Sequence, residues 1–272
     1  MKFADYYRRK FPGIVTHALT WLNVNLIPNS FLRRQNGIMK ILGGMDTVAG
    51  GPFQGMHYGP LAADKALLPR LLGTYEKEAY PAIEDIVSGK PDVVVVAGAG
   101  EGFYAVGLAR RLSDVRVIAF EISNWGRYLT KRHAEINFVK EQISILGNCT
   151  IDSLNSALAG AKRPVVVCDI EGGEEDVLDP QKVPPLKSCV ILVELHPMYV
   201  DGIEDEIASR FEATHNITTM HMGSRSISDI PKKIRKLLPQ AEALWAVDEV
   251  KLRGPVGIWM VLKPKTDLVM SI

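Results

Sequence analysis

The chain has 272 residues, of which 47% are hydrophobic and 23% are charged, as is typical of a globular protein with a sizeable core. Its 32 basic and 31 acidic residues nearly balance, so overall charge gives no reason to expect a nucleic acid as partner. The cysteines, Cys149, Cys168 and Cys189, are odd in number and form no CxxC pair. This argues against a disulfide framework or a cysteine zinc site, and it favours a reducing, cytoplasmic compartment.

The beginning of the chain differs in pattern from the rest. Residues 1–60 contain helical pieces broken by prolines, and we predict that they form a helical and loop appendage to a domain over residues 61–272. The apolar stretch 13–27 is interrupted by polar residues and is too short to span a bilayer. We therefore expect an amphipathic helix packed on the core and no stable membrane insertion.

A glycine-rich segment, residues 43–60, follows these helical pieces and has no sustained periodicity. It is predicted to be a mobile loop. Two interpretations remain open: a lid with His57 and Tyr58 as acceptor contacts, or a passive linker. Helices are expected next over residues 61–72 and 74–88.

From residue 92 onward, short β-branched runs alternate with helical patterns. The runs predict strands at 92–98, 115–121, 143–148, 164–171, 189–196, 217–222 and 257–264. Helices are expected between them, including 101–112, 124–139 and 203–211. This alternation predicts an α/β fold with a doubly wound, mostly parallel, Rossmann-like sheet of seven strands behind the N-terminal helical appendage. All strand carboxyl ends should share one edge, and ligands bind at that edge in such sheets.

Three glycines follow the first predicted strand and open a helix: Gly98, Gly100 and Gly102. Glycines at this place permit a tight turn and a close approach of backbone N–H groups to a ligand. A dinucleotide-binding GxGxxG motif would need glycine at position 103, where the chain has Phe103. The GxGxG spacing is instead typical of methyltransferases, in which the loop cradles the amino-acid and ribose part of the cofactor. A tight turn without a ligand is the structural alternative.

Polar residues end the next two predicted strands. Glu121 can accept hydrogen bonds from both hydroxyls of a ribose, an interaction that also serves NAD enzymes. Asn148 is a candidate for contact with the adenine edge, and a turn-forming role is an equal alternative. The pair therefore indicates nucleoside binding without choosing the cofactor.

Two further strands end in ionisable residues. Asp169 and Glu171 end one of them, and Glu194 and His196 end the next. Buried acids need partners, so these residues are candidates for a general base, for substrate orientation, or for binding a divalent metal such as Mg²⁺ or Mn²⁺. His196 is the first candidate for the base because an ordinary imidazole has a pKa near neutrality, and Asp169 is the second. Glu174 either faces the same edge or caps the next helix.

These segments together resemble one family. VVVVAGAGEGFYAVGLA, VIAFEIS, CDIEGGEEDVL and ILVELH, in this order, resemble the FkbM-type methyltransferases, which combine a glycine motif, an AFE strand, a DxEGxE segment and a (V/L)ExH strand. The resemblance covers about residues 74–262. It implies an S-adenosylmethionine cofactor bound by the glycine loop and Glu121, with the acids and His196 at the catalytic edge. It also implies methylation of an oxygen, less readily a nitrogen, of a small-molecule acceptor such as a sugar or natural product.

Two other functions are compatible with the residues. One is an NAD-dependent oxidoreductase on a similar fold, which Phe103 disfavours, and the other is a cofactor-binding module without catalysis. The N-terminal segment is a candidate for covering the acceptor site or for joining two copies of the chain into a homo-oligomer.

Overall fold

The computed structural model describes residues 29–59, 65–253 and 257–265, so the amphipathic helix predicted within 13–27 lies outside the described residues. The chain divides into two compact units, each built from two segments. The first unit is 1–77 with 223–255, and the second is 78–222 with 256–272. The domain boundary after residue 60 stays a prediction. Among the described residues, no helix is long and apolar enough to cross a membrane.

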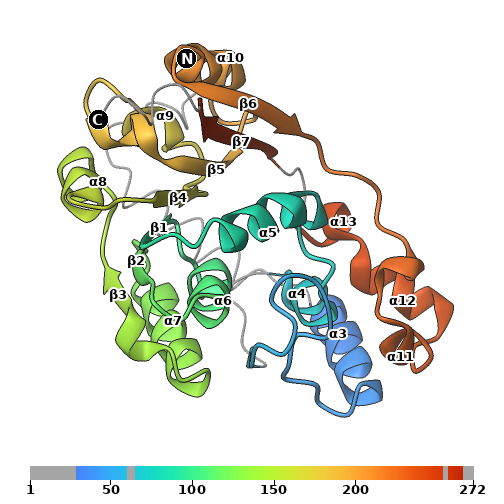
Figure 1. Ribbon diagram of the computed structural model, residues 1–272. Coiled ribbons are helices and arrows are strands. Elements are labelled where there is room, and N and C mark those ends of the chain that lie inside the picture. Colours follow the sequence, from blue (N-terminus) through green and yellow to red (C-terminus); the bar gives the residue numbers. More distant parts are fainter. Residues whose placement is uncertain (1–28, 60–64, 254–256, 266–272) are drawn as a thin grey trace. The chain divides into compact units, whose positions relative to one another are not determined.

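The second unit contains a seven-stranded sheet in the order β3-β2-β1-β4-β5-β7-β6 (Figure 1). The strands are β1 (Val93–Ala97), β2 (Arg116–Phe120), β3 (Ile143–Leu146), β4 (Pro164–Cys168), β5 (Val190–Leu195), β6 (His215–Met220) and β7 (Ile258–Pro264). Strands β1 to β5 pair in parallel, whereas β7 is antiparallel to both of its neighbours. The predicted doubly wound, mostly parallel Rossmann-like sheet is confirmed.

Helices cover both faces of this sheet. They are α5 (Tyr80–Ser88), α6 (Phe103–Arg111), α7 (Asn124–Ile136), α8 (Ile151–Leu158), α9 (Glu174–Val177) and α10 (Ile203–Phe211), with short 3₁₀ turns η1 (Lys77–Ala79), η2 (Lys140–Gln142) and η3 (Pro184–Ser188). Val93 and Val95 of β1 join an apolar cluster that contains Leu154 of α8 and Ile207 of α10. The alternate residues Val94 and Val96 are equally buried and face the other layer. Burial on both faces explains the continuous apolar runs in the sequence.

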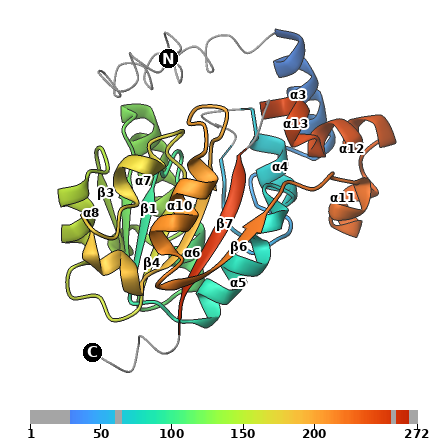
Figure 2. The ribbon, with the colours of Figure 1, turned by 90° about the horizontal axis from the view of Figure 1, so that it is seen from above.

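Strand β7 corrects one expectation. Because it runs antiparallel beside β6 (Figure 2), its carboxyl end lies at the opposite edge from those of the other strands. The reason is the connection: the chain leaves the end of β6, forms residues 223–255 of the first unit, and re-enters the sheet at the same edge. The edge that collects the carboxyl ends of β1, β2, β4 and β5 is unaffected.

The first unit is helical. It contains α3 (Asn29–Ile41), α4 (Leu67–Leu72), the 3₁₀ turn η4 (Ile227–Asp229), α11 (Lys232–Arg235), α12 (Gln240–Val247) and α13 (Glu249–Arg253). Its apolar cluster joins early and late segments of the chain, for example Ile38 and Leu72 with Trp245. An ion pair of 2.9 Å between Arg34 Nε and Glu242 Oε2 also links α3 to α12.

The glycine-rich segment is more ordered than its sequence predicts. Val48, Phe53, Met56 and Tyr58 are all at most 1% exposed, and the backbone N–H of Val48 donates to the carbonyl of Met56 at 2.9 Å. A β-bridge between Thr47 and His57 closes the loop. Residues 46–58 therefore form a packed loop, in which buried apolar side chains hold a backbone that has no regular period, and the mobility of the segment stays a prediction. The lid role of His57 and Tyr58 stays a prediction, and Tyr58 is fully buried.

A buried charged group also lies in the first unit. Glu249 is 1% exposed, and its carboxylate accepts hydrogen bonds from Arg225 Nε at 2.8 Å and from the backbone N–H of Glu76 at 3.1 Å. Burial raises the pKa of Glu249 to about 7, although the charge of Arg225 acts in the opposite direction. The buried Glu76 carboxylate adds to the upward shift.

This pKa predicts how the stability of the protein depends on pH. A carboxyl whose folded pKa is raised stabilises the fold fully below about pH 4.5, and this stabilisation is lost as pH rises through about 7. The glutamine in Glu249→Gln does not titrate, so this variant lacks the loss of stability that the wild type shows as pH rises. The free energy of unfolding of the variant minus that of the wild type should therefore increase by up to about 3 kcal/mol between pH 5 and 8.5. Urea unfolding at both pH values measures this difference. Glu242→Gln is the matched control in the same unit, and a difference for Glu249→Gln that is constant with pH would contradict the prediction.

Candidate active site

The predicted glycine loop connects β1 to α6, and its backbone conformation requires glycine. Gly98, Gly100 and Gly102 have φ of 81°, 54° and 89°, in the left-handed region that side chains disfavour. A Cβ atom on Gly98 would come within 1.7 Å of the carbonyl oxygen of Asp169. The loop is therefore packed directly against the chain that follows β4.

Helix α7 supports the loop from the other side. Thr130 Oγ1 donates to the carbonyl of Gly100 at 3.0 Å, and His133 Nδ1 lies 2.7 Å from the carbonyl of Glu101. A Cβ on Gly126 would meet the same Gly100 carbonyl at 2.8 Å, so this helix glycine permits the contact. These supports were not predicted. Their signal was the spacing of 126, 130 and 133, which places all three on one helix face.

Glu121, just after β2, is engaged by the backbone around it. Oε2 accepts from the N–H of Gly100 at 2.7 Å, and Oε1 accepts from the N–H of Ser123 at 2.6 Å. A carboxylate has about four acceptor sites, so ribose hydroxyls still find lone pairs there. Asn148 is exposed beyond the end of β3. The cofactor roles of both residues stay predictions.

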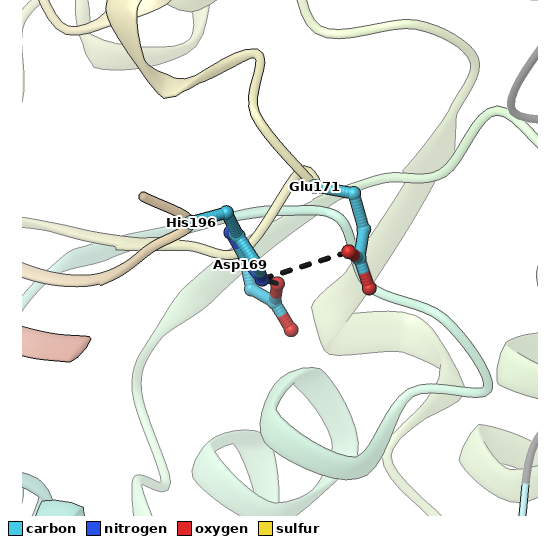
Figure 3. Close-up of side chains that lie close together, drawn as sticks. All are labelled: Asp169, Glu171 and His196. Carbon is cyan, nitrogen blue, oxygen red and sulfur yellow. Dashed lines mark ion pairs between the residues drawn. The ribbon is translucent and has the colours of Figure 1, made fainter. Parts of the chain in front are cut away.

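The four ionisable residues predicted for the catalytic edge come together in the structure. His196 Nε2 lies 3.6 Å from Asp169 Oδ1, 3.6 Å from Glu171 Oε2 and 4.0 Å from Glu194 Oε2. Figure 3 shows the side chains of Asp169, Glu171 and His196 converging. His196 and Glu194 are almost fully buried, whereas the Glu171 side chain is 53% exposed. The cluster thus has a buried histidine and one carboxylate that is open to solvent.

Glu174 decides the orientation of the histidine. Its Oε1 lies 3.1 Å from His196 Nδ1 and accepts the backbone N–H groups of Ile170 and Gly172 at 3.1 and 3.2 Å. The side chain is fully buried. Of the two alternatives left by the sequence, contact with the catalytic edge is the one observed. The hydrogen bond at Nδ1 leaves Nε2 directed to the carboxylates of Asp169 and Glu171.

Two further contacts shape the site. The backbone N–H of Gly257, just before β7, donates to Glu194 Oε1 at 3.0 Å, and a Cβ at this glycine would lie 2.5 Å from Glu194 Cγ. The ring of Tyr199 stacks on the imidazole of His196, with 5.8 Å between centroids. Neither contact was predicted. The contact of Gly257 depends on a long-range chain return, whereas Tyr199 follows His196 by three residues, and this short spacing was its signal.

The environment changes the proton affinity of His196. Burial alone would lower its pKa, but the hydrogen bond to Glu174 and the charges of Asp169, Glu174 and Glu194 raise the pKa to about 10. In this arrangement the imidazole holds a proton at neutral pH. The reason for ranking His196 first as a base, an ordinary pKa near neutrality, therefore does not hold here.

Comparison with protein-family models and with curated sequences finds no match. Among solved structures, the chain is similar to the O-methyltransferase TomG from Streptomyces achromogenes in complex with S-adenosylmethionine, at 13% identity and a TM-score of 0.46 over 74% of this chain and 88% of that chain. It is also similar to an O-methyltransferase from Bacillus cereus in complex with S-adenosylhomocysteine, at 13% identity and a TM-score of 0.43 over 89% and 96% of the two chains. A precorrin-6y C5,15-methyltransferase from Geobacter metallireducens has 14% identity and a TM-score of 0.45 over 68% and 88%. Likeness at this level carries no argument about activity.

Proposed function

We propose that this chain is an S-adenosylmethionine-dependent methyltransferase of the FkbM type that methylates an oxygen of a small-molecule acceptor. One observation carries the proposal: the glycine loop after β1 is packed against Asp169, so the candidate cofactor loop and the ionisable cluster share one sheet edge. The backbone N–H of Asp169 donates to the carbonyl of Ala97 at 2.9 Å, which fixes this proximity. Ligands of doubly wound sheets bind at such an edge, beside the point where strand order reverses.

The roles follow from the chemistry. The loop glycines would approach the amino-acid and ribose part of the cofactor, with Glu121 at the ribose hydroxyls and Asn148 at the adenine edge. The methyl group of a sulfonium is already activated, so the protein has to align it with the acceptor oxygen. A hydroxyl acceptor must also lose a proton; Asp169 is the first candidate for the base, and His196 can serve only after it has lost the proton that its raised pKa holds at neutral pH. A sugar or natural-product hydroxyl is the acceptor class that the resemblance implies.

The alternatives have less support. An NAD-dependent oxidoreductase would need the GxGxxG spacing, and Phe103 begins α6 at the position of its third glycine. A module without catalysis gives no reason for collecting four carboxylates around one buried histidine.

Ligand binding tests the proposal directly. Isothermal titration calorimetry with S-adenosylmethionine, S-adenosylhomocysteine and NAD should give binding of the first two and none of NAD. A thermal-shift series should agree, because a ligand that binds only the native state raises the melting temperature. Binding of NAD alone would favour the oxidoreductase and overturn the proposal.

Glu121→Ala should weaken binding of S-adenosylmethionine by about 1.5–3 kcal/mol, the usual scale for hydrogen bonds to a charged group. Because Glu121 also holds the glycine loop, the ribose contribution needs its own measurement. A double-mutant cycle with S-adenosylhomocysteine lacking the 2′-hydroxyl provides it: removing that hydroxyl should weaken binding to the wild type and have little effect on Glu121→Ala. Equal losses in both proteins, with unchanged circular dichroism, would limit Glu121 to loop support.

A further inference from the structure

Three side-chain atoms of the cluster are spaced as the ligands of one ion would be. His196 Nε2 is 3.6 Å from both Asp169 Oδ1 and Glu171 Oε2, and the three ligand atoms lie within 4.8 Å of one another. Hydrogen bonds are shorter than 3.6 Å. Two ligands bound at about 2.0–2.3 Å to a common ion, at angles between 90° and 110°, lie roughly 3–3.7 Å apart. The two separations from His196 Nε2 lie within this range.

The imidazole is oriented as in metal sites supported by an outer carboxylate. Glu174 Oε1 occupies the Nδ1 side of His196 at 3.1 Å, and two backbone N–H groups hold this oxygen in turn. Such a partner holds the proton on Nδ1, so a metal that displaces the proton of Nε2 would meet the lone pair of that nitrogen. The other oxygen, Glu174 Oε2, is buried and has no hydrogen-bond partner among the described residues. The histidine is therefore held with its ligating nitrogen toward Asp169 and Glu171 (Figure 3).

The excess of negative charge in the cluster also favours a bound cation. His196 is the ion-pair partner of four carboxylates: Asp169, Glu171, Glu174 and Glu194. One imidazole neutralises at most one of them, and a buried excess of negative charge is costly. Glu171 has a left-handed backbone, with φ of 55°, at a non-glycine position, and its side chain opens the cluster to solvent. This gives an ion a route of entry.

We propose that Asp169, Glu171 and His196 bind one divalent cation that accepts both carboxylate oxygen and imidazole nitrogen, as Mn²⁺ does. Three protein ligands leave coordination positions open. Given the proposed function, on which this second step rests, an open position would take the acceptor hydroxyl and help to remove its proton. An acceptor with two adjacent oxygens would fill two such positions, so the acceptor class narrows to vicinal diols, hydroxy acids or similar chelating groups.

Mn²⁺ alone is the probe. The full chain is stripped with EDTA, desalted and titrated with MnCl₂, while the electron paramagnetic resonance signal of hydrated Mn²⁺ reports the free ion. We expect one ion per chain. Glu171→Gln should weaken binding at least tenfold, and it should fold normally because the side chain is half exposed. Glu141→Gln, an exposed glutamate in η2 at the opposite edge of the sheet, is the matched control and should bind as the wild type does.

Absence of Mn²⁺ uptake by the wild type up to millimolar concentration, or equal uptake by Glu171→Gln, overturns the metal site. S-adenosylhomocysteine affinity, measured by calorimetry on the same samples, separates the two proposals. Cofactor binding without Mn²⁺ binding removes only the metal site. Mn²⁺ binding without cofactor binding would overturn the proposed methyltransferase function and would still support the metal site.

Discussion

Asp169→Asn and His196→Ala are each expected to lower the rate of methyl transfer by roughly 10²–10⁴. Both residues lie at the edge that holds the glycine loop; Asp169 can accept the acceptor proton, and the protonated His196 holds the carboxylate that does so. Affinity for S-adenosylhomocysteine should be nearly unchanged, because neither side chain belongs to the loop. The measurement is release of S-adenosylhomocysteine with a hydroxylated acceptor that the wild type turns over.

Asp176→Asn is the matched control for this experiment. It removes the same charge from an exposed position of α9, close in sequence to the cluster, and should keep the wild-type rate. Wild-type rates in both Asp169→Asn and His196→Ala would make the cluster structural. Methyl transfer would then depend on alignment of the two substrates alone.

The second large effect is expected at Gly98. A Cβ at this position would lie 1.7 Å from the carbonyl oxygen of Asp169, and φ is 81°, so Gly98→Ala has to displace backbone between two central strands. We expect a loss of more than about 4 kcal/mol in the free energy of unfolding, or failure to fold. Urea unfolding followed by circular dichroism measures it.

Gly100→Ala provides the comparison on the same loop. Its φ is 54°, but a Cβ there has no heavy atom within 4 Å, so only the conformational cost of about 1 kcal/mol applies. It should fold and bind S-adenosylhomocysteine more weakly, because the new methyl group occupies space beside the loop. Equal stability of the two variants would contradict the role assigned to the contact between Gly98 and Asp169.

Much of the sheet was predictable because the strands are buried on both faces. Runs such as 92–98 leave no polar face, and the length of the helical patterns between them permits parallel crossovers. The position and direction of β7 were not predictable from its own residues. They depend on where residues 223–255 return the chain, which is a long-range property.

In the candidate site, too, some features were predictable from the local sequence and others depend on long-range structure. Positions at or just after the ends of β4 and β5 brought Asp169, Glu171, Glu194 and His196 together as predicted, because strand carboxyl ends meet at one edge. Their proton affinities were not predictable, since the raised pKa of His196 depends on Glu174 and on burial. Likewise, the packing of residues 46–58 comes from buried side chains such as Phe53 and Met56, and the sequence of this segment has no periodic pattern that predicts it.

The two-segment construction of the helical unit has a consequence for biosynthesis. Ile38, Leu68 and Leu72 leave the ribosome long before Trp245, their partner in the same apolar cluster, has been made. At about 5–20 residues per second, the wait is on the order of ten seconds or more. During that time these early side chains lack the later members of their apolar cluster, while the strands β1 to β5 are being made. The nascent chain can therefore pair β1 to β5 first, whereas β6 and β7 join the sheet only after Trp245 has been made.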